Sequence, residues 1–210
     1  MKTLFQKWFV ALSAAVIVAG CGAAPQGTNI SVSDVGNVLW TKQFGTAIYD
    51  FTKGVSVDAN GNIYVAGGTE GGLDGNTNAG DYDGFIVKYD SAGIKQWTRQ
   101  FGTVNYDKAN GFSVDATGNL YVAGHTSGGL DGNANAGGSD GFLVKYDSSG
   151  TKEWTKQFGT ASGDEASDVS VDVNGNIYVA GDTSGGLDAN VNVGSSDGFL
   201  VKYDSSGVKQ

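Results

Sequence analysis

Three stretches of alternating Asp and Asn carry the side chains that are best suited to bind a metal ion. They read "LDGNTNAGDYDG", "LDGNANAGGSDG" and "LDANVNVGSSDG". Side-chain oxygens at every second residue are how the first half of an EF-hand loop supplies ligands to Ca²⁺. We call the three sets the calcium ladders: Asp74, Asn76, Asn78 and Asp83, then Asp131, Asn133, Asn135 and Asp140, and then Asp188, Asn190, Asn192 and Asp197.

The calcium ladders match an EF-hand loop only in part. In each ladder the glycine falls one place late, and no Glu closes the site with two oxygens, so the last Asp would have to take that role. The alternative, which we favour, is that Asp, Asn and Gly cap turns in a long loop. The same interpretation applies to Asp58, Asp115 and Asp172, whose carboxylates are placed to fix a hairpin turn. Ca²⁺ is the only cofactor to which the sequence points.

The ladders recur because the sequence is a threefold repeat. "WTKQFGT" at Trp40 returns as "WTRQFGT" at Trp97 and as "WTKQFGT" at Trp154, and both spacings are 57 residues. Apolar runs such as "IYVAG" and "FIVKY" alternate with Gly- and Asp-rich turns, and no window of helical length has a 3.6-residue period. We therefore predict an all-β protein in which each repeat forms four antiparallel strands. The repeats are 40–96, 97–153 and 154–210.

A four-stranded unit at a fixed period has two apolar faces that neighbouring units must cover, which is typical of propeller blades. The segments "VDANGNIYVAGGT", "NAGDYDGFIVKYDSAG" and "WTKQFGT", each present in three versions, resemble the SBBP repeat, a bacterial β-propeller repeat. The resemblance covers residues 37–210, which we take as the repeat domain. It implies a propeller fold in a surface or secreted protein, and it leaves the biochemical activity undefined.

Three blades are too few for an ordinary ring, because propellers close with about 4 to 8. Residues 37–45 are predicted to form the fourth strand of a blade, whereas the last repeat ends before its own fourth strand. The repeat domain is thus a partial or open propeller unless another chain completes it. A homodimer, in which each N-terminal strand completes the partner's last blade, is one interpretation. The other, which we favour slightly, is a fragment of a longer product.

Positions at which the repeats differ predict a recognition face. Tyr49 and Tyr106 lie in "AIYD" and "VNYD", which become "ASGD" in the third repeat, and Gly68, His125 and Asp182 occupy one equivalent position. Both sets flank the first hairpin of a repeat at the same end. We therefore expect them to gather on one face of the propeller, where loops carry variable side chains on a fixed framework.

Two classes of function fit this face. The first is a non-catalytic surface scaffold that binds a protein or a glycan. The second is a propeller enzyme, a lyase or a hydrolase, because such enzymes contain similar "GNIYVAG" strands. His125 is the only histidine, and the sequence contains no HExxH, no P-loop and no well-placed GxGxxG. We therefore favour the scaffold over the enzyme; a calcium-binding module is compatible with either.

The N-terminal residues predict export and lipid anchoring. Lys2 and Lys7 precede an apolar run, "WFVALSAAVIV", which is too short to span a membrane, and the run ends in "VAGC". This layout resembles a bacterial lipoprotein signal, with residues 1–20 removed, Cys21 lipidated and residues 21–36 as a flexible tether to the membrane. The formal net charge of −9 argues against nucleic acid as a partner.

Overall fold

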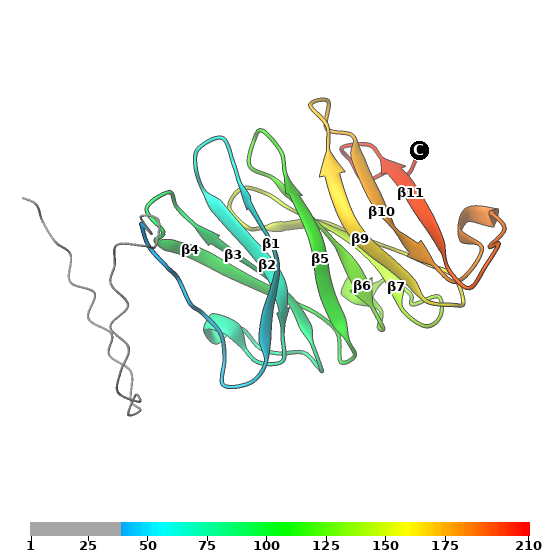
Figure 1. The fold of residues 1–210 in the computed structure, drawn as a ribbon, viewed down its shortest axis with the longest axis horizontal. Coiled ribbons are helices and arrows are strands. Elements are labelled where there is room, and N and C mark those ends of the chain that lie inside the picture. The colour runs from blue at the N-terminus through cyan, green and yellow to red at the C-terminus, as the bar shows by residue number, and fades with distance from the viewer. Residues whose placement is uncertain (1–38) are drawn as a thin grey trace, which may run out of the picture. The chain divides into compact units, whose positions relative to one another are not determined.

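The computed structural model describes residues 39–210, which form three antiparallel β-sheets (Figure 1). Each sheet contains most of one repeat, and the first two sheets also take their fourth strand largely from the start of the following repeat. The first sheet contains β1 (Asp50–Val57), β2 (Ile63–Thr69), β3 (Asp83–Tyr89) and β4 (Lys95–Phe101). The second contains β5 (Asp107–Val114), β6 (Leu120–Thr126), β7 (Asp140–Tyr146) and β8 (Lys152–Phe158). The third contains β9 (Asp164–Val171), β10 (Ile177–Thr183) and β11 (Asp197–Tyr203). The prediction of an all-β fold built from propeller blades is confirmed, with three strands instead of four in the third blade.

Within a blade the strands pair in the order of the sequence, so each blade is a meander. The second and third strands are joined by a loop that contains one turn of 3₁₀ helix. These short helices are η1 (Leu73–Gly75), η2 (Leu130–Gly132) and η3 (Leu187–Ala189). The calcium ladders therefore lie in the loops between the second and third strands.

An aspartate fixes the turn between the first two strands of each blade. Asp58 Oδ1 accepts hydrogen bonds of 2.9 Å from the backbone N–H groups of Asn60 and Asn62. Gly61 takes a φ of 79°, a value that side chains disfavour. Asp115 and Asp172 make the equivalent bonds in the other blades. The interpretation of these acidic residues as turn-fixing is confirmed.

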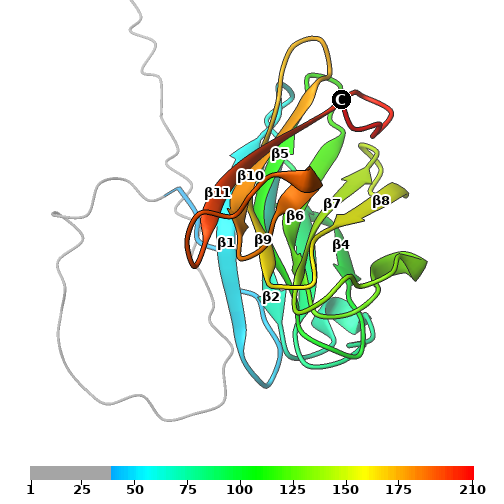
Figure 2. The same cartoon turned by 90° about the vertical axis from the view of Figure 1, so that its right-hand side faces the viewer.

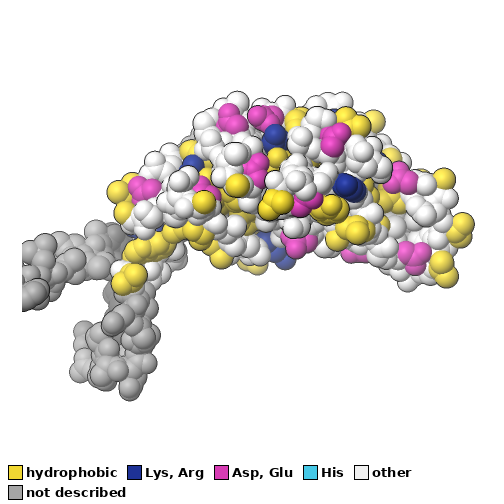
Figure 3. All heavy atoms as spheres, turned by 90° about the horizontal axis from the view of Figure 1, so that it is seen from above, with side chains coloured by type: hydrophobic (Ala, Val, Ile, Leu, Met, Phe, Trp, Pro, Cys, Tyr) yellow, Lys and Arg dark blue, Asp and Glu magenta, His cyan; other side chains and the backbone are white. Residues whose placement is uncertain are grey.

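The blades fan out from their first strands. β5 packs on β1, β2 and β3 of the first blade, and β9 packs on β5, β6 and β7 of the second. The first strands thus touch one another, as the innermost strands of a propeller do, and β4 and β8 lie farther out. Apolar and acidic side chains are mixed over the upper side of the blades as drawn in Figure 1 (Figure 3).

Each blade presents a forward face to the blade that follows. In the first blade this face consists of Tyr64, Ala66 and Ile86, which join one buried cluster with Leu120 and Val122 of the second blade. The forward face of the second blade buries in the same way against β10. Tyr178, Ala180 and Leu200 form the forward face of the third blade.

The forward face of the third blade is uncovered by the described residues. Leu200 is 71% exposed, whereas its equivalents Ile86 and Leu143 are fully buried. Beside this face, β11 forms the outer edge of its sheet, and only a single bridge between Tyr203 and Lys209 begins a further strand (Figure 2). The third blade therefore has an open face and an open edge.

The predicted strand at residues 37–45 is wrong where the structure describes it. Residues 39–45 are extended chain without strand pairing, because a β-strand needs a neighbouring edge and none of the described strands lies beside them. Phe44 is nevertheless packed against Phe85 of the first blade, with ring centroids 5.8 Å apart and an interplanar angle of 88°. The segment is thus held on the first blade by its side chain.

Candidate functional site

The starts of the innermost strands are fixed by buried aspartates. Asp50 Oδ2 accepts hydrogen bonds from the backbone N–H and the hydroxyl of Thr46 at 2.5 and 3.0 Å. Asp107 makes the same pair of contacts with Thr103 at 2.5 and 2.8 Å. The short loop before each strand is therefore held in place, and with it the tyrosine that directly precedes each aspartate.

A row of five rings crosses from the first blade to the second at this end. Tyr49 lies 5.8 Å from Phe51 between ring centroids, and Phe51 lies 5.9 Å from Tyr82. Tyr82 lies 5.0 Å from Tyr106, which stacks on His125 at 5.6 Å with the ring planes 17° apart. We call these residues the aromatic row. Centroid distances of about 4.5–7 Å are those of interacting aromatic pairs, so the rings support one another.

A glycine makes room for the row in the first blade. A Cβ atom on Gly68 would lie 2.6 Å from Cζ of Phe51, so any side chain there would displace that ring. His125 occupies the equivalent position in the second blade, where the residue paired with it is Lys108 instead of Phe51. The difference between Gly68 and His125 therefore follows from the difference between their cross-strand partners.

Each innermost strand contains a one-residue β-bulge beside the row. The residues left without a partner are Lys53, Asn110 and Ser167. Asn110 donates through Nδ2 to Glu165 Oε1 at 2.9 Å and to the Ala166 carbonyl at 3.0 Å, which ties the second blade to the third. Bulges redirect side chains and recur next to functional sites.

His125 is the most buried ring of this end. Its Nδ1 lies 3.3 Å from Glu165 Oε1 and 3.2 Å from the Asn110 side-chain nitrogen. Burial lowers the pKa of His125; Glu165 opposes this shift, Lys108 adds to it, and Asp107 and Asp182 oppose it. The imidazole is thus kept neutral to a lower pH than a free histidine would be.

Charged side chains lie beside two rings of the row, Phe51 and Tyr82. Lys53 and Lys108 both lie over the Phe51 ring, at 5.6 and 5.7 Å from its centroid. Burial, followed by the charge of Lys53, lowers the pKa of Lys108. The pKa of Tyr82 is raised to about 12, chiefly by its hydrogen bond to Glu70 and then by desolvation. The Tyr82 hydroxyl is therefore engaged by the Glu70 carboxylate.

Part of the aromatic row is open to solvent. Tyr49 is 59% exposed and the neighbouring Ile48 is 56% exposed. A shallow pocket of about 360 Å³ opens against the row, and it is lined by Ile48, Glu70, Gly80, Asp81, Tyr82 and Tyr106. An open pocket lined by two tyrosines and two carboxylates has the chemistry of a recognition site.

The structure brings together most of the predicted recognition face. Tyr49, Tyr106 and His125 belong to one row, Gly68 lies beneath Phe51, and Asp182 acts on the charge of His125. Sequence comparison missed Phe51, Tyr82, Lys53, Asn110 and Glu165. Differences between the repeats could have identified two of them. Phe51 is equivalent to Lys108 and Glu165, and Tyr82 is equivalent to Ser139 and Ser196.

The first calcium ladder is engaged within the loop. Asp74, at a φ of 52°, pairs with Lys95 and accepts a hydrogen bond from Thr98. Asn76 donates to the Leu73 carbonyl at 2.7 Å, and Asn78 accepts from the Gly80 N–H at 2.8 Å. Asp83 accepts hydrogen bonds from Ala79 and Gln100, both at 2.9 Å.

The other two ladders repeat this pattern. Asp131 pairs with Lys152 and Asp188 with Lys209. The remaining members cap turns in the same way; they are Asn133, Asn135, Asp140, Asn190, Asn192 and Asp197. No group of three or more His, Cys, Asp or Glu suited to a metal lies within residues 39–210. Turn caps and ion pairs thus engage the ladder side chains, while Asn78 Nδ2, Asp83 Oδ1 and Asp140 Oδ1 are buried without a hydrogen-bond partner among the described residues. Calcium binding stays a prediction.

The predictions about the N-terminus fall outside the described residues. These are the signal at residues 1–20, the lipid attachment at Cys21 and the tether at residues 21–36. In the part of the chain that the structure describes, no helix has the length and apolar character needed to span a membrane.

Comparison with known proteins matches the three blades to one family. The model of the SBBP beta-propeller repeat matches residues 39–74, 96–131 and 153–188, which together make up about half of the chain. The regulatory protein FlaEY of Caulobacter vibrioides is 30% identical over 224 residues, covering 93% of this chain and 22% of that protein. The uncharacterized WD repeat-containing protein L264 of Acanthamoeba polyphaga mimivirus is 27% identical over 126 residues, covering 52% of this chain and 9% of that protein. The chain thus spans about a fifth or less of the length of these relatives.

Proposed function

The chain belongs to the SBBP beta-propeller repeat family, and on this premise we propose that it is a non-catalytic recognition module that binds a carbohydrate through the aromatic row. The observation that carries the proposal is the exposed end of the row, where Tyr82 and Tyr106 line one pocket and the exposed Tyr49 packs edge-on against Tyr82. Tyrosine combines an apolar ring with a polar hydroxyl, so it can pack on the face of a sugar and also hydrogen-bond to it.

The polar groups around the pocket complete this chemistry. Glu70 and Asp81 supply acceptors for sugar hydroxyls, and the hydrogen bond from the Tyr82 hydroxyl to Glu70 holds that carboxylate beside the ring. Lys53 and Lys108 lie over the neighbouring ring of Phe51, which packs against Tyr82. A mixed set of acceptors and donors beside exposed rings fits a polyhydroxylated ligand better than it fits a flat apolar partner surface.

The enzyme alternative rests on one observation, the pairing of His125 with Glu165. The His125 side chain is only 11% exposed, and it lies under the Tyr106 ring with its Nδ1 engaged by neighbours. A general base must reach the proton that it removes. We therefore assign His125 to the support of the row and propose binding without catalysis.

The location that we propose is a bacterial membrane surface, to which Cys21 attaches the chain by a lipid. Two lysines, an apolar run and "VAGC" occur in the order that export and lipidation require. The Caulobacter relative is described as a regulatory protein. A module that senses a surface carbohydrate is compatible with a regulatory role.

A glycan array tests the proposed function. The full-length chain, labelled with a fluorophore, is applied in its wild-type form and as Tyr49→Ala and Tyr106→Ala. Val173→Ala is the matched control, because Val173 is fully exposed in a hairpin turn at the other end of a blade. We expect the wild type and the control to bind the same glycans and both tyrosine variants to lose at least about tenfold in signal, since stacked aromatic residues dominate such sites. Equal binding by all four proteins, or binding to no glycan, would overturn the proposal.

A further inference from the structure

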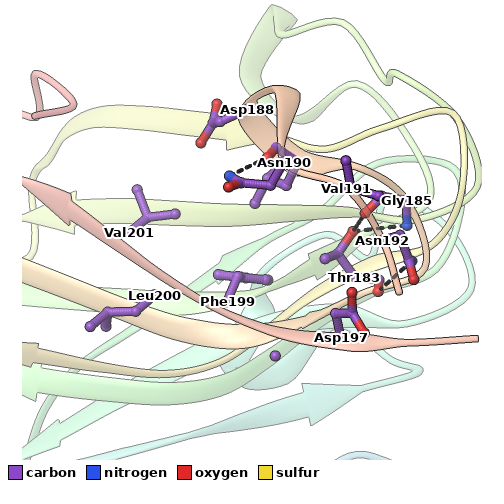
Figure 4. Close-up of a pocket in the computed structure, with 12 residues that line it drawn as sticks. Thr183, Gly185, Asp188, Asn190, Val191, Asn192, Asp197, Phe199, Leu200 and Val201 are labelled. Atoms are coloured by element: carbon purple, nitrogen blue, oxygen red, sulfur yellow. Dashed lines mark hydrogen bonds between the residues drawn. The ribbon is translucent and has the colours of Figure 1, made fainter. Parts of the chain in front are cut away.

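A groove runs along β11 at the open edge of the third blade (Figure 4). Its volume is about 330 Å³, and it is lined by residues of η3, the following loop and β11. Leu187, Asp197, Gly198 and Leu200 are among them. The residues of this groove have closely similar equivalents in the other two blades, where the groove is filled.

The fourth strand fills the groove in the first blade. Gln100 Oε1 accepts a hydrogen bond of 2.9 Å from the Leu73 N–H, and Gln100 Nε2 donates to Asp83 Oδ2 and to the Gly71 carbonyl, both at 2.9 Å. Phe101 lies directly over Gly84, so that a Cβ on that glycine would be 2.6 Å from the ring.

The second blade repeats these contacts with Gln157 and Phe158. Gln157 accepts from the Leu130 N–H at 2.9 Å and donates to Asp140 Oδ2 at 2.9 Å. Phe158 lies 2.8 Å from the Cβ position of Gly141. A fourth strand is therefore recognised by a Gln and a Phe at fixed positions, and the groove of the third blade presents the same partners.

The chain carries this Gln and Phe once more, in the segment at residues 40–46. Gln43 aligns with Gln100 and is exposed, and Phe44 aligns with Phe101. Phe44 lies 5.8 Å from Phe85 and 6.2 Å from Tyr89. The segment is therefore held on the first blade by Phe44, and its glutamine is exposed.

Phe101, in the fourth strand of the first blade, packs on the second blade with the same geometry as Phe44 packs on the first blade. Phe101 lies 5.7 Å from Phe142 and 6.3 Å from Tyr146, with interplanar angles of 87° and 45°. The corresponding angles at Phe44 are 88° and 48°. The segment at residues 40–46 thus already stands where the outer strand of a preceding blade would stand.

We propose that the groove along β11 binds residues 40–46 of a second copy of this chain. The pairing of β3 with β4 gives the register: Phe44 opposite Gly198, Gln43 opposite Phe199 and Thr41 opposite Val201. Gln43 then accepts from the Leu187 N–H and donates to Asp197. Residues 39–210 contain one such groove and one such segment, so two copies make two equal junctions.

The open forward face of the third blade is buried by the same arrangement. Leu200 and its neighbours pack against the first blade of the second copy, as Ile86 packs against the second blade within the chain. Two copies of residues 39–210 then supply six blades, which lies within the range of about 4 to 8 in which propellers close, whereas three copies would exceed it. The aromatic rows of the two chains come to the same end of the ring.

The mass of the full-length chain in solution tests the proposal. The Cys21→Ser protein is used throughout, so that no lipid or native thiol interferes. We expect light scattering to give twice the mass of one chain, and we expect Leu200→Arg and Gln43→Ala each to weaken the dimer by at least about tenfold. Val173→Arg places the same charge on another exposed valine, outside the groove, and should leave the dimer intact.

A disulfide between two differently tagged chains tests the register. Thr41→Cys is introduced into one chain and Val201→Cys into the other, because the equivalent pair, Thr98 and Val87, face each other across β3 and β4. Oxidation should join the two chains, and Thr41→Cys mixed with Val173→Cys should not. A monomer at all concentrations, an open-ended series of larger oligomers, or equal crosslinking of both mixtures would overturn the proposal.

Discussion

Phe101 is the residue whose removal best tests how the blades hold one another. Its side chain is 6% exposed, lies over Gly84 in its own blade and packs edge-on against Phe142 of the next. Truncating a buried Phe to Ala reduces the free energy of unfolding by about 3–5 kcal/mol. Roughly 0.5–1.5 kcal/mol of that loss belongs to the aromatic pair. Phe101→Ala should therefore remove much of the stability of a domain of ordinary marginal stability.

Phe44 provides the internal comparison. It makes the same ring contacts with the first blade but is only half-buried, and no glycine of the described residues lies beneath it. Partial burial of a Phe is worth about 1 kcal/mol, less than the 1.5–3 kcal/mol of full burial. Phe44→Ala should therefore lower the unfolding free energy by about 1 kcal/mol at low protein concentration, and by more at high concentration if a second copy covers it.

Urea unfolding followed by tryptophan fluorescence measures both losses. Phe101→Ala and Phe44→Ala are compared with the wild type at a concentration low enough to keep the chain monomeric. The slope of the unfolding free energy against urea concentration is also compared, because repeated units can unfold in steps. Phe101→Leu should lower the unfolding free energy by less, so it keeps the test usable if Phe101→Ala does not fold. Equal losses for Phe44→Ala and Phe101→Ala, or a loss below about 1 kcal/mol for Phe101→Ala, would refute this account of the packing.

Three further predictions concern charge, metal and lipid. Burial lowers the pKa of His125, so its contribution to stability is complete above the unfolded pKa of about 6.5 and is lost as the pH falls through the folded pKa. Thermal melts from about pH 7.5 to about pH 5 should therefore show a fall in melting temperature that is smaller in His125→Gln. An identical fall in both proteins would contradict this prediction. If the calcium ladders bind Ca²⁺, excess Ca²⁺ should raise the melting temperature by several degrees relative to chelator, since a hundredfold excess over Kd contributes about 2.7 kcal/mol; an unchanged midpoint would leave turn capping as their only role. Metabolic labelling with a fatty acid should mark the wild type and not Cys21→Ser, and equal labelling would exclude the anchor.

The architecture was predictable because the sequence repeats itself. A spacing of 57 residues, turn residues such as Asp58 and Gly61, and alternating apolar strands are local signals, and the structure obeys them in all three blades. Local hydrogen bonds between an Asp side chain and the next few N–H groups need no knowledge of the rest of the fold. The turn-capping hydrogen bonds of Asn76 and Asn78 in the first ladder are local in the same way.

The state of the N-terminal segment was not predictable in this way. The letters "WTKQFGT" at Trp40 are those of a strand, and the same letters at Trp154 do form one. Strand pairing is a long-range interaction that requires a free edge, and the described residues offer none beside Trp40. Identical sequence therefore gives a strand in one place and unpaired extended chain in the other.

The aromatic row was predicted in part. Positions that differ between repeats identified Tyr49, Tyr106 and His125. The contribution of Asn110 could not be found, because a bulge turns its side chain toward the next blade and periodicity alone does not reveal a bulge. The joining of rings from separate segments into one row likewise depends on how the blades stack.

The affinity for carbohydrate of the wild type and of one row variant tests the central claim most directly. Isothermal titration of the glycan selected on the array into the full-length chain, and then into Tyr106→Ala, gives two dissociation constants under identical conditions. The loss of a stacked aromatic contact should raise the dissociation constant at least about tenfold, which corresponds to about 1.4 kcal/mol. An unchanged dissociation constant, with Tyr106→Ala folded as the wild type is, would contradict recognition through the aromatic row.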